Sequence, residues 1–276
     1  MELQTKVAIE PQAFCLEQQS DHIMTVGSCF ATEMAAKMKD AGFDVLHNPF
    51  GVLYNPLSIA ECLERCLDDR PIDSGDLVEV DGLWHSWLHH GSFSRSSKEE
   101  CLEVCNRAIH EAHEFLERAT CLIVTFGTAY VFELVENGMV VGNCHKAVAA
   151  RFARRRLTVD EIVSRWQPLL ARLPQAVFTV SPIRHMADGA HGNQLSKSTL
   201  ILAVDQLQTH YFPSYEIMMD ELRDYRFYAD NMTHPSPLAV DIIWERFAET
   251  YFTPATRNLC RLNAKQAKRD RHIPLH

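Results

Sequence analysis

The sequence predicts one α/β domain of three layers, in which a parallel β-sheet lies between two layers of helices. Short apolar runs alternate with helical patterns along the chain, as in proteins built from β-α-β units. The runs at Ile23–Val26, Leu122–Phe126 and Ala176–Val180 are almost continuously apolar, which is typical of strands buried on both faces. Together these observations indicate a flavodoxin-like sheet with helices on both sides.

The predicted elements follow one another in a regular order. The strands are Ile23–Val26, Val45–Leu46, Leu122–Phe126, Ala176–Val180 and Glu216–Met219. The helices are Ala31–Ala41, Pro56–Leu67, Glu99–Ala119, Thr158–Leu173, Ser196–Phe212 and Pro237–Tyr251. Gly42 ends the first helix, because glycine is common just after a helix C-terminus.

Two segments interrupt this alternation. Leu77–Trp87 contains the pair Asp81-Gly82, and Tyr130–Asn143 contains the pair Asn137-Gly138. Such pairs between alternating apolar residues favour the tight turn of a β-hairpin. We therefore expect two β-hairpin insertions near the functional site, where they could pair with each other.

Polar or glycine residues follow the predicted strands directly. These residues are Ser28, Gly51, Gly127 and Ser181. The carboxyl ends of parallel strands lie at one edge of a sheet, and ligands bind there in open α/β sheets. We therefore expect the functional site at this edge.

Composition excludes several classes of function. The net charge of -9 makes nucleic acid an unsuitable partner, and no apolar run is long enough to predict a membrane span. The nine cysteines are an odd number without paired spacing, and the N-terminus lacks a secretory signal pattern. We expect free thiols in a reducing cytoplasm, and neither a metal nor another cofactor.

The two ends of the chain differ in character. We expect residues 1–256 to form the single domain and residues 257–276 to form a basic, solvated tail. A contact of this tail with an acidic partner or a neighbouring subunit of a homo-oligomer is the alternative.

Ser28 and His234 are the candidate reacting groups. Ser28 lies where an apolar strand gives way to a helix, and the free N–H groups of a helix N-terminus favour developing negative charge. His234 lies far downstream, with Asp230 and Asn231 just before it. A serine followed by an acid and a histidine is a workable order for nucleophilic catalysis. A helix N-cap is the structural alternative for Ser28, a turn residue is that for His234, and Cys29 is a rival nucleophile.

Several motifs resemble a known family. Gly27-Ser-Cys-Phe-Ala31 is the motif that names the GSCFA domain family, and the likeness runs from about residue 22 to residue 252. The other segments that carry it are Asn48–Pro56, Trp84–Trp87, Gly127–Tyr130, Asn143–Lys146, Ser181–His185, Asn193–Lys197 and Tyr225–Tyr228. That family is similar to the SGNH (GDSL-like) hydrolases, so the resemblance implies a three-layer α/β/α fold and acyl-ester chemistry with a Ser–His–Asp triad.

The resemblance assigns roles to individual residues. Ser28 takes the place of the nucleophile and His234 that of the base. The position of the acid, three residues before the histidine, is occupied by Asn231, and Asp230 lies one residue earlier. Either side chain could orient the imidazole, with a slight preference for Asp230.

The oxyanion hole departs from the SGNH pattern as well. Its usual asparagine is missing from the Gly127-Thr128-Ala129 stretch. The expected donors are therefore the N–H groups of Ser28 and Gly51 together with Thr128.

The remaining predicted site residues would contact the substrate. Asn55 lies in one of the segments that carry the resemblance, and His85, His145 and Lys146 are expected at the edge of the sheet, where they could instead brace the hairpins. Arg184 and His185 follow the fourth strand and could bind an anionic group of the substrate. An ordinary carboxylate partner is an equal alternative for them.

Three functions remain open. The first is a serine esterase acting on a small acyl ester, such as that of an O-acetylated sugar. The second is an acyltransferase with the same site, in which the hairpins close over the substrate. The third is a non-catalytic ligand-binding relative, suggested by the displaced acid and the missing asparagine.

Overall fold

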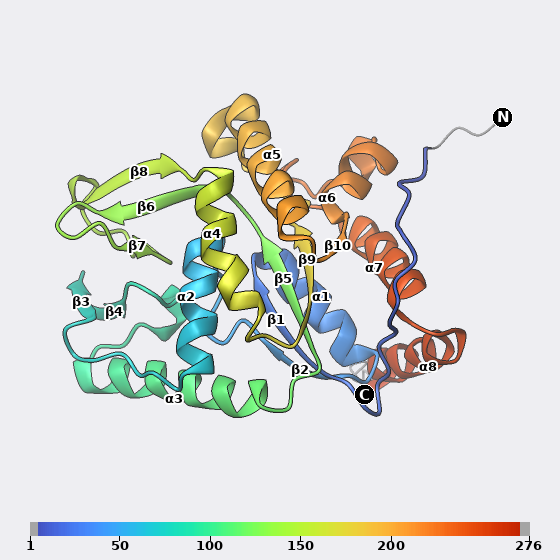
Figure 1. Cartoon of the computed structure of the whole chain (residues 1–276), viewed down its shortest axis with the longest axis horizontal. Helices are drawn as coiled ribbons and strands as arrows, with labels where there is room; N and C mark the ends of the chain where they lie inside the picture. Colours follow the sequence, from blue (N-terminus) through green and yellow to red (C-terminus); the bar gives the residue numbers. More distant parts are fainter. Residues whose placement is uncertain (1–4, 271–276) are drawn as a thin grey trace, which may run out of the picture.

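The computed structural model describes residues 5–270 and confirms the three-layer α/β/α fold. Its central sheet has five parallel strands in the order β10-β9-β5-β1-β2 (Figure 1). The strands are β1 (His22–Gly27), β2 (Asp44–His47), β5 (Cys121–Phe126), β9 (Gln175–Val180) and β10 (His210–Phe212). This is the flavodoxin-like order, which reverses between β1 and β5, and ligands bind at the carboxyl ends of strands beside such a reversal.

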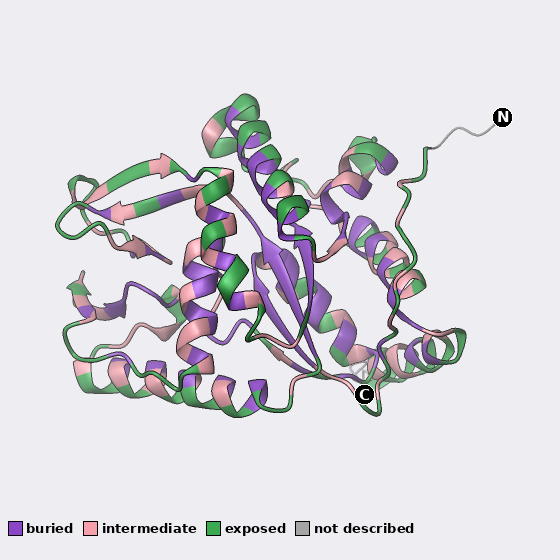
Figure 2. Ribbon diagram, viewed as in Figure 1, coloured by how far each residue is buried: buried purple, intermediate pink, exposed green. Residues whose placement is uncertain are grey.

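Helices cover both faces of this sheet. One face packs against α1 (Cys29–Asp40), α7 (Pro237–Tyr251) and α8 (Pro254–Asp270), and the other against α2 (Pro56–Leu67), α3 (Lys98–Leu116), α4 (Val159–Leu170) and α5 (Gly189–Leu207). Side chains of β1 alternate between the faces: Ile23 joins the cluster under α1, whereas Met24 joins the cluster under α2. Figure 2 shows the strands buried between the two layers.

The prediction of the fifth strand was wrong. Glu216–Met219 is helical, in the short α6 (Ser214–Glu216) and the wide turn Ile217–Glu221 that follows it. The fifth strand is β10, inside the segment predicted as the end of a helix. That helix, α5, ends at Leu207 because Gln208 adopts a left-handed conformation with φ 52°. Pro213 then closes the three-residue strand.

Both predicted hairpins are present. The first pairs β3 (Leu77–Val80) with β4 (Leu83–Ser86), and the second pairs β6 (Tyr130–Leu134) with β7 (Val140–Val141). A strand that was not predicted, β8 (Phe152–Arg156), extends the second hairpin to three strands.

The expected pairing between the hairpins was wrong, because the two hairpins form separate sheets. They meet through side-chain packing of Trp87 against Leu134 and Val141, and through a loop hydrogen bond in which the N–H of Gly142 donates to the carbonyl oxygen of Trp87 at 2.7 Å.

Residues 257–270 of the predicted tail belong to helix α8, which packs against α1. Cys260 of this helix is buried, and the Asn263 amide donates to the carbonyl oxygen of Ala41 at 2.9 Å. The rest of the predicted tail, residues 271–276, lies outside the described residues. The nine cysteines are free thiols, and no helix within residues 5–270 is long and apolar enough to cross a membrane.

Candidate active site

A cavity of about 360 Å³ opens at the carboxyl ends of β1, β5 and β9, where the strand order reverses. Ser28 follows β1, Gly127 and Thr128 follow β5, and Ser181 follows β9. Its complete lining is Ser28, Cys29, Tyr54, Gly127, Thr128, Ser181, Ile183, Arg184, His185, Met186, Ala187, Thr233 and His234. The structure thus brings together Ser28 and His234, which lie about two hundred residues apart in the sequence.

Gly27 allows the backbone to place Ser28 at this edge of the sheet. Its φ of 133° is a conformation that side chains rarely permit, and a Cβ atom there would lie 2.1 Å from the carbonyl oxygen of Thr125. The next N–H, that of Ser28, donates to the same oxygen at 3.2 Å. Only glycine therefore fits between β1 and β5 at this point.

Ser28 does not act as a side-chain helix cap. It occupies the N-cap position of α1, but its hydroxyl makes no capping hydrogen bond. Its oxygen Oγ is buried and has no hydrogen-bond partner among the described residues. Ser28 is only 1% exposed and lines the cavity. An unpaired buried hydroxyl costs about 1–3 kcal/mol. The hydroxyls of Thr25, Thr125 and Tyr251 are also buried without a partner, but Ser28 alone of the four lines this cavity.

His234 lies on the opposite wall, in the exposed segment before α7. The segment is held by the N–H of Ala229, which donates to the His234 carbonyl oxygen at 2.8 Å, and by the N–H of Arg184, which donates to the Thr233 carbonyl oxygen at 3.0 Å. Ser28 Oγ and the His234 ring share this cavity, but no hydrogen bond joins them. Such bonds are often long or absent in enzymes without substrate.

Asn231, and not Asp230, contacts the imidazole. Asn231 Oδ1 accepts hydrogen bonds from the N–H groups of Thr233 and His234 and from the Thr233 hydroxyl, each at 3.0 Å. This fixes the orientation of the amide, so Nδ2 is the atom that lies 2.8 Å from His234 Nδ1 and donates to it. The ring therefore carries its proton on Nε2. Asn231 thus orients the imidazole as a donor, because three other donors occupy its carbonyl oxygen.

The predicted oxyanion donors need correction. Gly51 lies in a turn against His90, outside the cavity lining, and its N–H donates to the Asn48 carbonyl oxygen at 2.7 Å. The N–H of Ser28 is also taken, as described above. Thr128 lines the cavity, and its hydroxyl contacts Ser196 Oγ at 3.1 Å. The other donors near Ser28 are the N–H groups of Cys29 and Phe30, the first two of α1, which have no partner inside the helix, whereas the N–H of Ala31 donates to the Ser28 carbonyl oxygen at 2.8 Å.

Lys197 is a site residue that sequence reasoning missed. It is fully buried on α5, and its Nζ donates to the carbonyl oxygens of Gly127 and Ser181, each at 2.8 Å. Burial lowers the pKa of Lys197 to about 7. The lysine thus ties the ends of β5 and β9 where they form the cavity wall. The available signal was its place on the apolar face of the helix, three residues before the buried Leu200.

Arg184, His185 and Asn55 lie at or beside this cavity. Arg184 and His185 line it, and His185 Nδ1 lies 3.1 Å from a carboxylate oxygen of Asp188. Asn55 lines a neighbouring cavity of about 220 Å³ and caps α2, because its Oδ1 accepts from the N–H of Ser58 at 2.8 Å.

The structure places His85, His145 and Lys146 elsewhere. They line a separate cavity of about 430 Å³ between the insertions. The rings of His85 and His145 stack with centroids 4.4 Å apart, and burial lowers the pKa of His145 to about 4. These contacts match the alternative role of bracing the hairpins.

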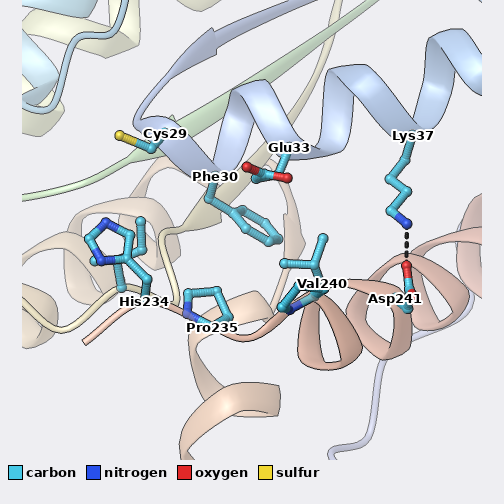
Figure 3. A pocket seen from close by; sticks show the side chains of 10 residues that line it. Cys29, Phe30, Glu33, Lys37, His234, Pro235, Val240 and Asp241 are labelled. Atoms are coloured by element: carbon cyan, nitrogen blue, oxygen red, sulfur yellow. Dashed lines mark hydrogen bonds and ion pairs between the residues drawn. The ribbon is translucent and has the colours of Figure 1, made fainter. Parts of the chain in front are cut away.

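Cys29 and His234 line a second cavity as well, of about 250 Å³, between α1 and α7 (Figure 3). In this view Phe30 projects from α1 toward Pro235 and Val240, and the Lys37–Asp241 ion pair links the two helices. The Cys29 Sγ lies 3.4 Å from the Tyr54 hydroxyl, so the rival nucleophile has a polar partner whereas Ser28 Oγ has none.

A protein-family model matches most of the chain. No curated protein matches the chain. The family model of the GSCFA family matches residues 22–247, from the first residue of β1 to the second half of α7. This range holds Ser28, His234 and the sheet that positions them. The chain therefore belongs to the GSCFA family.

Proposed function

We propose that the protein is a serine esterase that hydrolyses a small acyl ester with Ser28 as nucleophile. The observation that carries the proposal is the Ser28 hydroxyl itself, buried without a partner at the N-terminus of α1, in a residue that lines the same cavity as His234. An O-acetylated sugar is one ester of suitable size for this cavity.

The reaction would follow the usual steps of acyl transfer. Ser28 Oγ attacks the ester carbonyl carbon while His234 Nε2 takes the hydroxyl proton, and the same proton then passes to the departing alcohol. Water attacks the acyl-serine by the same route and releases the acid. The first N–H groups of α1 face the negative charge that develops next to Ser28, where the helix dipole also favours it.

His234 must change tautomer before it can act as a base. Its Nε2 carries the proton while Asn231 donates to Nδ1, and proton uptake from Ser28 requires the opposite arrangement. The Thr233 hydroxyl oxygen lies 3.1 Å from Nδ1 and can accept from Nδ1–H when the Asn231 amide turns away. Thr233 thus takes the place of an acid in orienting the base.

A ligand-binding relative without turnover is the second candidate. It is favoured by the Asn231 amide, which donates to Nδ1 and holds Nε2 in the protonated form. A protein of this kind would bind esters in the cavity without cleaving them.

Hydrolysis of p-nitrophenyl acetate separates the two candidates. We expect steady turnover by the wild type and loss of turnover to the uncatalysed background in Ser28→Ala and His234→Ala. Ser20→Ala, which changes an exposed turn far from β1's carboxyl end, is the matched control and should keep full activity. Full activity of Ser28→Ala would exclude the esterase, and loss of activity in Cys29→Ala alone would move the nucleophile to the thiol.

A further inference from the structure

The Ser28 cavity has one permanently charged lining residue, an arginine, and no acidic one, in a protein that is acidic as a whole. The chain has a net charge of -9, yet the lining of this cavity contains Arg184, His185 and His234 and no aspartate or glutamate. The local field therefore opposes the overall charge. A cavity of this kind favours anionic ligands and repels cationic ones.

Arg184 is the fixed charge of this cavity. It follows β9, and its backbone N–H holds the Thr233 carbonyl oxygen, which places it beside the His234 segment. Burial raises the pKa values of Tyr215 and Tyr228, and the positive charge of Arg184 acts against both rises.

No ion pair neutralises Arg184 within the described part of the chain, in contrast to other arginines of the same molecule. Arg154 pairs with Asp188, Arg155 with Glu133 and Glu161, and Arg165 with Glu61 and Glu64. Asp188, which directly follows the lining residue Ala187, faces Arg154 and His185 instead. A half-buried guanidinium without a carboxylate beside an open cavity is available for a ligand.

We propose that the substrate carries an anionic oxygen group, which Arg184 binds while Ser28 attacks the ester. The inference rests on the proposed function and narrows its substrate class to anionic esters. The guanidinium presents two parallel N–H groups that match a carboxylate or a phosphate. A charge-assisted contact of this kind raises kcat/KM by about 10–100-fold over a neutral ester of the same shape.

Matched ester pairs test the preference on both sides of the ester bond. For an anion on the acyl side, mono-p-nitrophenyl glutarate is compared with p-nitrophenyl valerate. For an anion on the alcohol side, 4-acetoxybenzoate is compared with its methyl ester. We expect the anionic member of one pair to be preferred by about 10–100-fold and the preference to shrink at high salt. Arg184→Met should abolish the preference, and Arg184→Lys should keep part of it because the charge remains. Arg172→Met, which removes an arginine paired with Asp68, should keep all of it.

Binding measured without turnover keeps the two proposals apart. Calorimetric titration of Ser28→Ala with glutarate and with inorganic phosphate should show binding of at least one anion, weakened about tenfold or more by Arg184→Met. Anion binding in a protein that hydrolyses no ester would overturn the esterase and leave the anion site standing. Ester turnover with no anionic preference in either pair, or a preference that survives Arg184→Met, would overturn the anion site and leave the esterase standing.

Discussion

Gly27→Ala tests whether the approach of β1 to β5 sets the geometry of the Ser28 site. The new Cβ atom would lie 2.1 Å from the Thr125 carbonyl oxygen, and such contacts are essentially never below 3.0 Å, so the backbones must separate by about 0.9 Å, the difference between these distances. The backbone on either side resists this shift, because the Gly27 N–H donates to Asn48 Oδ1 at 2.8 Å and its carbonyl oxygen accepts from the N–H of Leu53 at 3.0 Å.

The cost of this substitution has three parts. A non-glycine residue at φ 133° costs about 1–3 kcal/mol, and forcing a methyl group into a packed site costs about as much again. Loss of the Ser28 N–H bond to Thr125 adds about 1 kcal/mol. We expect the free energy of unfolding to fall by about 3–7 kcal/mol, a large share of the 5–15 kcal/mol that is typical of a domain.

Urea unfolding followed by tryptophan fluorescence measures this loss, since Trp166 is buried in the core. Gly138→Ala is the matched control, because Gly138 also has a positive φ of 72° but has no atom within 4 Å of the added Cβ. That variant should lose only about 1–2 kcal/mol, from backbone strain alone. If Gly27→Ala loses no more stability than the control, the close approach of the strands does not constrain the site.

Three further predictions follow from the site. Ser28→Ala should leave the free energy of unfolding unchanged or raise it, because Oγ makes no hydrogen bond, whereas Ser97→Ala, which removes the cap of α3, should lower it by about 1 kcal/mol in the same urea titration. The pKa of Lys197 is about 10.5 in the unfolded chain and about 7 in the folded chain, so the unfolded state binds more protons between these pH values. The free energy of unfolding should therefore rise with pH across this range, by at most roughly 5 kcal/mol. Chemical denaturation should show this rise in the wild type and not in Lys197→Met. Asn231→Asp should raise ester turnover about tenfold and move the acidic limb of the pH–rate profile to higher pH. The reason is that a carboxylate accepts from the Nδ1–H of His234 and stabilises the imidazolium. Slower turnover with an unmoved limb would contradict the assigned tautomer.

Sequence patterns predicted the strands and turns whose residue types match their surroundings in the fold. The continuous apolar runs identified β1, β5 and β9 because all three lie in the middle of the sheet, where both faces are buried. Asp81-Gly82 and Asn137-Gly138 identified the hairpins because these turns need residues that tolerate a positive φ. By contrast, the edge strand β10 has only three residues, too few for a periodic pattern.

The sequence predicted that Ser28 and His234 would lie close together, and both line one cavity, but it did not predict the contacts that they make there. Their chemistry, the place of Ser28 after a buried strand and that of His234 in a loop led to this prediction. The charge state of the cavity was not predicted, because it depends on which arginines find carboxylates in space. The tautomer of His234 likewise depends on the three donors that hold the Asn231 carbonyl, two of which are backbone groups that no side-chain pattern reveals.

Labelling with a fluorophosphonate probe tests the central claim most directly. The probe reacts with an activated serine hydroxyl, and peptide mapping by mass spectrometry then locates the adduct. The account predicts one adduct per chain, on Ser28, lost in Ser28→Ala and slowed in His234→Ala, with Cys29 unmodified. A wild-type protein that stays unlabelled while its ester-hydrolysing activity is intact, or an adduct on any other residue, would contradict it.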